Sequence, residues 1–252
     1  MKKIVFIVAG CLFFNLGFSQ DDSTIVTTEI PTRAANTKTI KLPNRPGDHL
    51  MIQLSSDHWT GMPDSISSHQ TGLSRGFSIY FMLDKPFRNS PKYSIGIGAG
   101  ISTSNITFKK MGVDLKAQST LLPFQALDST NHFKKYKLAT SYLEIPLEFR
   151  LTSKPANVNK SFKAALGIKV GTLINAHTKG KGLQDKNNNL TNSFTQKENS
   201  KRFINGSRFT GTARIGYGIF SLFGTYQLNN VLKDGAGPDM RLYQIGLTIS
   251  GL

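Results

Sequence analysis

Residues 142–151 alternate between large apolar side chains and side chains that are mainly charged. The charged positions are Glu144, Glu148 and Arg150, and the residues between them are Ile, Leu, Phe and one proline, Pro146. A period of two is typical of an extended strand, whose successive side chains point to opposite faces. This pattern fits a half-buried strand of a soluble sheet. It also fits a membrane strand with lipid on one side and a polar interior on the other.

Seven further segments show the same alternation, at residues 50–55, 77–87, 93–101, 162–171, 208–217, 220–228 and 243–249. The connections between segments are alternately long and short, and the long polar ones lie around residues 60–75, 110–135, 177–202 and 235–238. Bacterial outer-membrane barrels sort their connections in this way, with short periplasmic turns and long external loops. We therefore predict an all-β fold for residues 49–252: an eight-stranded antiparallel up-and-down transmembrane β-barrel with short periplasmic turns and long extracellular loops.

The N-terminus has the features of a secretory signal. A basic start precedes a mostly apolar run that ends at the small residue Ser19. We predict a signal peptide at residues 1–19 and a flexible periplasmic tail at residues 20–48, because the second stretch is polar and has no apolar periodicity. Two alternatives remain. One is an uncleaved anchor, although the run is shorter than the about 20 residues of a spanning helix. The other is lipidation of Cys11, the only cysteine of the chain.

The chain is strongly basic, with 31 Lys and Arg against 15 Asp and Glu and a formal net charge of +16. Such an excess suits nucleic acid, anionic lipid or acidic glycan as a neighbour. An exported protein does not meet nucleic acid, so we expect an envelope partner instead. The expected partners are outer-membrane lipid and lipopolysaccharide, the outer-membrane insertion machinery and, in one reading, a further envelope protein.

The polar faces of the segments would point into the barrel. The interior of a barrel of about eight strands is narrow and filled by side chains, so a pore is not expected. Seven charged residues lie on these faces: Glu144, Glu148, Arg150, Lys163, Lys169, Arg208 and Arg214. Because a buried charge is costly unless it is paired, we predict an interior ion-pair network in which Glu144 and Glu148 meet Lys169 and Arg214. In a soluble sheet the same residues would face water.

Aromatic residues stand on the apolar faces beside the three short turns. They are Phe87, Tyr93, Phe149, Phe162, Tyr217 and Phe220. Aromatic rings prefer the head-group zone of a membrane, so we predict a periplasmic-side aromatic girdle. At the other end Trp59 and Phe108 fall out of phase with the apolar faces unless a bulge intervenes.

The connection at residues 177–202 is predicted to be a basic external loop, carrying Lys179, Lys181, Lys186, Lys197, Lys201 and Arg202. It would either bridge the phosphates of lipopolysaccharide or form a solvated surface. No phosphate loop, zinc spacing or nucleophile elbow is present, so we expect no catalytic residue, no metal site and no cofactor. Ser56 and His58 are the one pair that would suit the alternative of a lipid A-modifying enzyme.

Three short stretches resemble the small outer-membrane β-barrel proteins of the Bacteroidetes known as PorT-like. They are Tyr142-Leu143-Glu144-Ile145-Pro146-Leu147, the signal end Phe18-Ser19-Gln20, and the pair Tyr226-Gln227-Leu228 and Tyr243-Gln244-Ile245-Gly246-Leu247. Because no catalytic motif is present, we expect a non-enzymatic integral outer-membrane protein with a structural or binding role through its external loops or periplasmic tail. The resemblance implies the barrel fold and the outer-membrane location. It also implies an alternative, a subunit of a secretion or gliding apparatus. The C-terminus, Ile249-Ser250-Gly251-Leu252, departs from the aromatic ending that is usual for insertion into the outer membrane.

Overall fold

The computed structural model describes residues 49–71 and 74–250, which all belong to one compact unit. The predicted signal peptide (1–19), the predicted tail (20–48) and Cys11 lie outside the described residues. In the part of the chain that the structure describes, no helix is long and apolar enough to cross a membrane.

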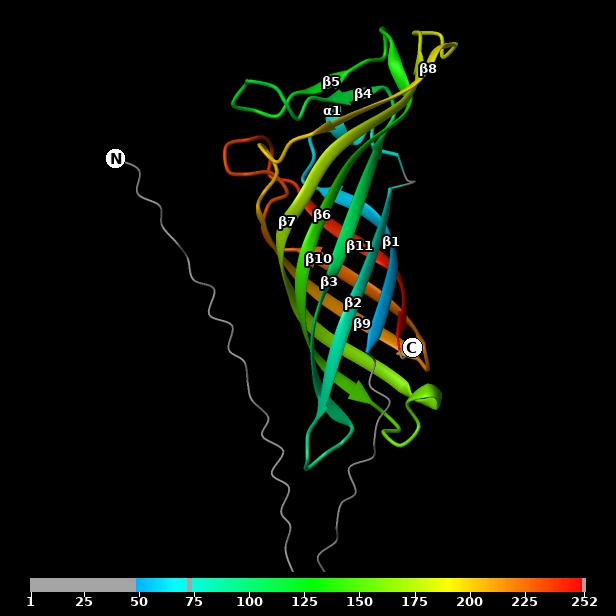
Figure 1. Cartoon of the computed structure of the whole chain (residues 1–252), viewed down its shortest axis with the longest axis vertical. Coiled ribbons are helices and arrows are strands. Elements are labelled where there is room, and N and C mark those ends of the chain that lie inside the picture. Colours follow the sequence, from blue (N-terminus) through cyan, green and yellow to red (C-terminus); the bar gives the residue numbers. More distant parts are fainter. Residues whose placement is uncertain (1–48, 72–73, 251–252) are drawn as a thin grey trace, which may run out of the picture. The chain divides into compact units, whose positions relative to one another are not determined.

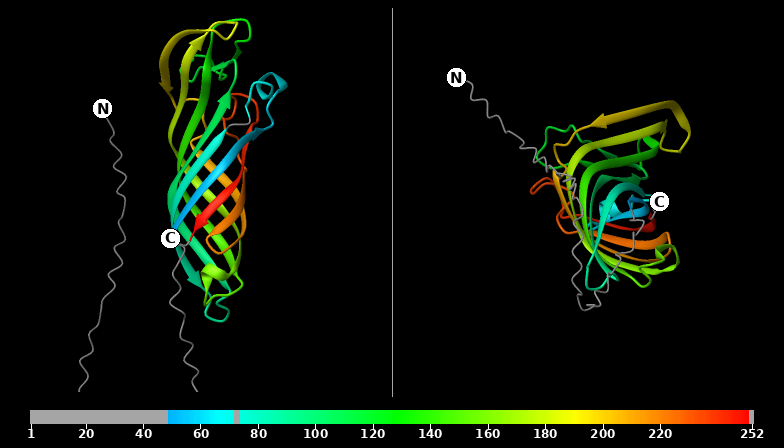
Figure 2. Two further views of the ribbon diagram at one scale, coloured as in Figure 1. Left: turned by 90° about the vertical axis from the view of Figure 1, so that its right-hand side faces the viewer. Right: turned by 60° about the horizontal axis from the view of Figure 1, so that its bottom comes forward.

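Eight long antiparallel strands form a ring (Figure 1). They are β1 (Leu50–Thr60), β2 (Arg75–Pro86), β3 (Tyr93–Phe108), β6 (His132–Thr152), β7 (Phe162–Gln184), β9 (Ser207–Tyr217), β10 (Phe220–Gln227) and β11 (Arg241–Ser250). Neighbours along the chain pair with each other, and β1 pairs with β11. Since β6 pairs with both β3 and β7, the sequence of pairings returns to its start. The view in Figure 2 (right) shows the ring from near its end.

The alternation in sequence becomes an inside and an outside. On β6 the apolar residues Leu143, Ile145 and Leu147 are exposed on the outer face, whereas Glu144 and Glu148 between them are buried. The other strands of the ring repeat this arrangement, so the exposed surface of the ring is a belt of large apolar side chains. A protein in water buries such residues, and this inversion is typical of a barrel whose outer face meets lipid.

Three short connections lie at one end of the ring: residues 87–92, residues 153–161 with a short 3₁₀-helix (Val158–Lys160), and residues 218–219. The long connections gather at the other end, where Figure 1 places α1 (Asp64–Ser67), β4 (Met111–Val113) and β5 (Phe124–Ala126). The predicted sorting of connection lengths is therefore present. Five of the eight strands have 8–12 residues, close to the ~9–11 that a membrane strand needs. The other three are longer than predicted: β3 has 16 residues, β6 has 21 and β7 has 23.

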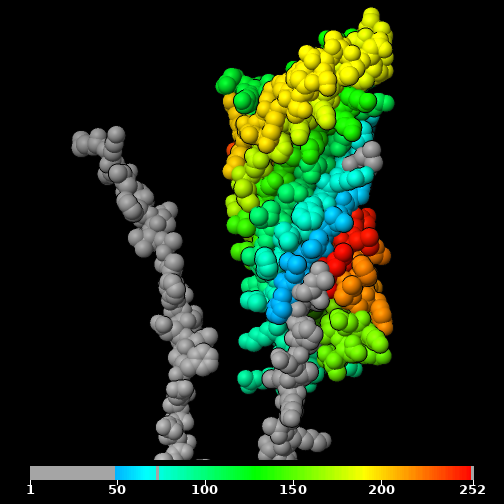
Figure 3. All heavy atoms as spheres, turned by 45° about the vertical axis from the view of Figure 1, so that its right-hand side comes forward, coloured from blue at the N-terminus to red at the C-terminus, as the bar shows by residue number. Residues whose placement is uncertain are grey.

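Residues 177–202, predicted to be a long basic external loop, are mostly strand. β7 continues to Gln184, turns, and pairs with β8 (Leu190–Asn199), which takes the place beside β7 that β9 occupies lower down. We call the upper parts of β6 and β7 together with β8 the strand extension; Figure 3 shows β8 (yellow) at one end of the molecule. The segment was missed because the inner side chains of this part of β7 are small and the outer ones are Lys and His, whereas β8 is polar and exposed along almost its whole length. No apolar alternation therefore marks it as a strand.

The prediction that residues 110–135 form a long polar loop also needs correction. Met111, Val113 and Leu115 from this region are buried, and β6 already begins at His132. They join a hydrophobic cluster with residues from the other long connections, including Ile66 and Phe203. This cluster, which we call the cap core, is built at the end of the ring where the long connections meet.

Trp59 and Phe108 belong to the cap core. They point to the inner side of the ring and pack against each other with ring centroids 5.8 Å apart. The two residues fall out of step with the outward apolar residues because they fill the end of the interior beside the long connections and do not face lipid. No bulge is needed to explain their positions.

Pro146 interrupts the ring locally, as expected of a residue that has no backbone N–H to donate. In the ladder between β3 and β6, Ile97 pairs with Leu147 and Gly100 with Glu144, but the positions between them have no pair. The register is the same on both sides of this gap, so the proline causes a break in pairing without a bulge. On the other side β6 pairs with β7 through Pro146, and the bulge in that ladder lies at Ser141/Tyr142.

Candidate functional site

Glu144 lies at the centre of one ionic cluster inside the ring. It is 2% exposed and comes from the middle of β6. Arg208 of β9 donates two hydrogen bonds to Glu144 Oε1, one of them from Nε at 2.8 Å, and the Tyr80 hydroxyl donates to Oε2 at 2.5 Å. The Arg208 guanidinium also lies over the Tyr142 ring, 4.2 Å from its centroid. A buried charge is tolerable when it is paired and hydrogen-bonded in this way.

Glu148 forms a second cluster four residues farther along β6, nearer the short connections. Its Oε2 accepts a hydrogen bond from Arg150 Nε and another from Arg214, each at 2.9 Å. Arg150 in turn lies 3.6 Å from Asp84 of β2. Acids and bases from three strands of the ring, β2, β6 and β9, are therefore joined across the interior.

Lys169 does not form the direct ion pair with Glu144 or Glu148 that we predicted. Its Nζ donates to Gln53 Oε1 at 2.9 Å and to the Tyr80 hydroxyl at 3.2 Å, so it reaches Glu144 only through Tyr80. The Glu148–Arg214 pair of the prediction is present, whereas Arg208 takes the place that was expected for Lys169 beside Glu144. Lys163 is buried on the same inner face, at the short-connection end of β7.

Glycines make room for these charged groups. Glu144 lies between Gly100 of β3 and Gly171 of β7, and Glu148 lies between glycines at the equivalent positions of the same two strands. A β-carbon on Gly171 would lie 2.9 Å from Glu144 Cγ, and one on Gly100 would overlap the Tyr80 ring and the Ile79 carbonyl. The narrow interior thus holds long side chains because their neighbours have none.

The interior leaves little free space. Between the ionic clusters and the cap core there is a cavity of about 10 Å³, lined by Trp59, Tyr142, Arg208 and others. Such a space holds about one water molecule. Above it the cap core fills the end of the ring, so the described residues show no continuous channel.

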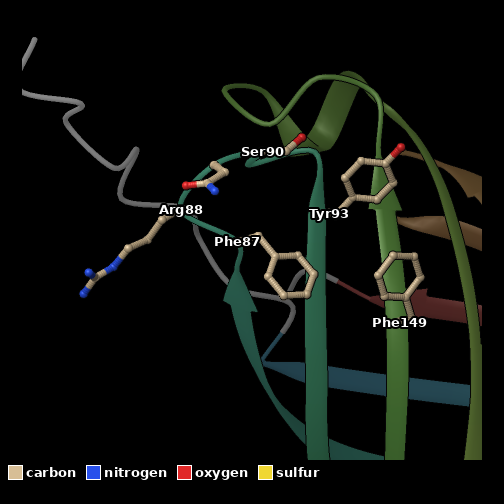
Figure 4. A pocket seen from close by; sticks show the side chains of 6 residues that line it. Phe87, Arg88, Ser90, Tyr93 and Phe149 are labelled. Carbon is tan, nitrogen blue, oxygen red and sulfur yellow. The ribbon is translucent and has the colours of Figure 1, made fainter.

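The six residues of the predicted girdle are all exposed on the outer face at the short-connection end. Tyr217 is paired in register with both Phe162 and Phe220. Tyr93 stacks on Phe149 with centroids 5.7 Å apart, and Phe87 lies against the same ring at 6.4 Å. Figure 4 shows these three rings side by side in a shallow pocket, with Arg88 pointing away from them.

Comparison with known proteins agrees with this geometry. Residues 48–233 match a family model described as an outer membrane protein beta-barrel domain. The chain belongs to this family. Among solved structures, the chain resembles Ail, the attachment invasion locus protein of Yersinia pestis, with 10% sequence identity and a TM-score of 0.34 over 80% of this chain and 94% of that one. No curated protein matches the sequence.

As a member of the outer-membrane β-barrel domain family, the chain is an all-β outer-membrane protein. Its exposed apolar belt is therefore the surface that meets lipid, and its buried polar face is the barrel interior. The expectation of a soluble sheet with charges facing water is excluded by the burial of Glu144 and Glu148 as well as by the family.

The basic residues predicted in the external loop are divided by the structure into two groups. Lys179, Lys181 and Lys197 lie on the strand extension of this outer-membrane barrel, and Lys186 lies in the turn between β7 and β8. Lys201 and Arg202 follow β8 and form hydrogen bonds with neighbouring segments.

Their local contacts are mostly with backbone carbonyls, and Arg202 also donates to Gln118 Oε1 at 3.2 Å. Lys201 Nζ donates to Leu173 at 3.3 Å, and Arg202 donates to Gln118 and Ser119 at 3.3 Å. These contacts tie the chain after β8 to the cap, so the two residues are not part of one exposed basic loop.

The β7–β8 turn is held by one carboxylate. Asp185 Oδ1 accepts hydrogen bonds from the backbone N–H groups of Asn187 and Asn189 at 2.9 and 2.8 Å. These bonds hold the pKa of the Asp185 carboxyl below its usual range.

Ser56 and His58 lie on the outer face of β1, with Ser56 Oγ 2.9 Å from His58 Nε2. The His58 ring stacks on Tyr243 at 5.2 Å. The acid next to them in sequence, Asp57, is buried on the inner face and hydrogen-bonded to Gln244. Asp57 therefore does not serve as the third group that would orient His58 as a base. Within residues 49–71 and 74–250 there is no cluster of three or more His, Cys, Asp or Glu that could hold a metal ion.

Proposed function

We propose that the chain spans the outer membrane as an eight-stranded barrel, with the short connections in the periplasm and the cap and strand extension outside the cell. Its role is non-enzymatic, and it binds through the extracellular part. The observation that carries this proposal is the contrast between the two ends: the interior is filled by ion pairs and closed by the cap core, whereas β6, β7 and β8 project a rigid, polar sheet.

The aromatic girdle supports the proposed orientation, since it lies at the short-connection end and periplasmic turns are short in bacterial barrels. The ionic clusters support a role other than conduction. A small barrel whose lumen is occupied by paired side chains offers no path for solutes.

A test of the orientation uses two single cysteines. We expect Lys186→Cys, in the β7–β8 turn, to react with a membrane-impermeant maleimide on intact cells. Asn89→Cys, in the turn between β2 and β3, is the matched control at the other end and should react only after the outer membrane is permeabilised. Labelling of Asn89→Cys alone on intact cells would reverse the orientation, and labelling of neither would place the extension away from the surface.

A second candidate role is that of a subunit in a larger envelope machine, as the resemblance to PorT-like proteins implies. One observation favours it: among the described residues β8 pairs only with β7, so its other edge presents unpaired backbone groups. The exposed side chains of Leu190 and Phe194 lie on this strand. Such an edge can accept a strand from another protein. Purification from native membranes would decide, because a stoichiometric partner lost on Phe194→Asp substitution supports a subunit, and isolation of the chain alone supports an independent binding protein.

A further inference from the structure

Three lysines form a row across the outer face of the strand extension. Lys137 of β6 pairs with Lys179 of β7, and Lys179 pairs with Lys197 of β8. Residues that are directly opposite in an antiparallel sheet point to the same face with their β-carbons about 5 Å apart. In the next outward position of the ladder Lys135 pairs with Lys181. We call these five residues the lysine row.

Like charges that face each other across strands destabilise a sheet, and the sequence offers nothing to offset them on this face. The only acids in residues 132–141 and 175–199 are Asp185 and Glu198. Asp185 is used in the β7–β8 turn, and Glu198 is paired with Thr178, whose side chain is buried on the opposite face. Lys137 has a neutral acceptor instead, Asn105 Oδ1 at 2.6 Å.

Burial and the nearby positive charges together lower the pKa of two titratable groups. Partial burial and the nearby Lys179 lower the pKa of Lys137. Partial burial, followed by Lys197, Lys137 and Lys179, lowers the pKa of His177, which lies one pair nearer the barrel. An anion placed over this face would relieve the repulsion.

The lysine row lies beyond the end of the apolar belt, on the same outer face. Ile174, which is 44% exposed, is the last apolar side chain on the outer face of β7. Lys179 lies five residues farther along the strand, about 16 Å at about 3.3 Å per residue. Strands of outer-membrane barrels are tilted and a lysine side chain can reach back toward the membrane, so its ammonium group can contact the head-group layer.

We propose that the lysine row binds the phosphate groups of outer-leaflet lipid, of the kind that lipopolysaccharide carries, and so fixes the strand extension against the membrane surface. This inference rests on the proposed function, because it requires the extension to lie on the outer side. The positive charge of this face favours an anionic ligand. Because the face continues from the lipid-facing belt, a lipid is favoured over a soluble ligand.

The test measures binding of lipid A to the purified full-length protein in detergent by native mass spectrometry. The probes are bis-phosphorylated lipid A and the same lipid with both phosphates removed. A lysine near an anionic surface contributes about fivefold to binding. We therefore expect Lys137→Gln/Lys179→Gln/Lys197→Gln to weaken binding of the phosphorylated lipid on the order of a hundredfold and to abolish its preference over the dephosphorylated lipid.

A matched control removes the same charge elsewhere. Lys116, Lys186 and Lys233 are exposed and lie outside the row, and their joint substitution by Gln should leave the preference intact. Equal losses in the two triple variants would show that only net charge matters and would overturn the proposal. So would equal binding of both lipids to the natural protein, or displacement of lipid by millimolar inorganic phosphate. None of these outcomes affects the cysteine-labelling result, so failure here is distinct from failure of the proposed orientation.

Discussion

Replacement of Glu144 by Gln should strongly destabilise the barrel. The substitution keeps the volume of the side chain, so no cavity forms, but it removes the negative charge that faces Arg208. Arg208 is itself buried and, apart from Glu144, has Ser102 as a hydrogen-bond partner at 2.9 Å. Removal of one member of a buried ion pair costs about 3–5 kcal/mol because the other charge stays buried without compensation.

The size of this effect separates an ion pair from an ordinary hydrogen bond. Loss of hydrogen bonds alone would cost about 1–3 kcal/mol. The double substitution Glu144→Gln/Arg208→Gln removes both charges, so we expect it to be more stable than Glu144→Gln alone, with a coupling free energy of about 2 kcal/mol or more.

The free energy of unfolding can be measured by urea titration of the protein refolded in phospholipid vesicles. The fluorescence of Trp59, the only tryptophan, reports on the buried cap end of the ring. Glu198→Gln is the control, since this acid lies on the projecting extension, and we expect a change within about 0.5 kcal/mol. If Glu144→Gln changes stability as little as the control, or if the double variant is no more stable than the single one, the ionic cluster does not stabilise the interior.

Three further predictions concern other parts of the chain. Gly100→Ala should lower the yield of folded protein, measured as the heat-modifiable band on a gel, because overpacking costs about 1–3 kcal/mol. Gly206→Ala is the control and should leave the yield unchanged, since no atom lies within 4 Å of its new β-carbon. Asp185→Ala should raise amide hydrogen exchange in the β7–β8 turn, and unchanged exchange would show that its side-chain hydrogen bonds do not order the turn. The hydrogen bond with His69 lowers the pKa of Asp128, so the contact should favour the folded loop above the usual carboxyl pKa of about 3.9 and be lost as pH falls through the lower folded value. The protection of backbone amides near residue 128, relative to their intrinsic exchange rate at each pH, should therefore fall in acid in the natural protein and change less with pH in Asp128→Asn.

Much of the ring could be read from local pattern. Residues 142–151 alternate because one face meets lipid and the other meets the interior, and this requirement acts on each strand separately. The sorting of long and short connections and the aromatic residues beside the short ones are equally local. The sequence was enough to predict outward apolar and inward charged faces and the exposed rings at one end.

The strand extension could not be predicted in this way. Beyond Ile174 the outer residues of β7 are His and Lys and the inner ones are small, so no contrast in polarity marks the two faces. β7 stays extended there because its backbone pairs with β6 and β8. The lysine row is a consequence of these pairings, since its members are distant in sequence.

The sequence by itself determined that Glu144 and Glu148 would be buried among bases in a narrow interior. Only the tertiary structure decided which base each acid meets. Glu144 pairs with Arg208, whereas Lys169 donates to Gln53 and Tyr80. Which base lies beside each acid depends on the relative position, along the barrel axis, of residues on strands that are distant in sequence. These relative positions are set by the register of all the strand pairs around the ring, and the sequence of one strand does not determine that register.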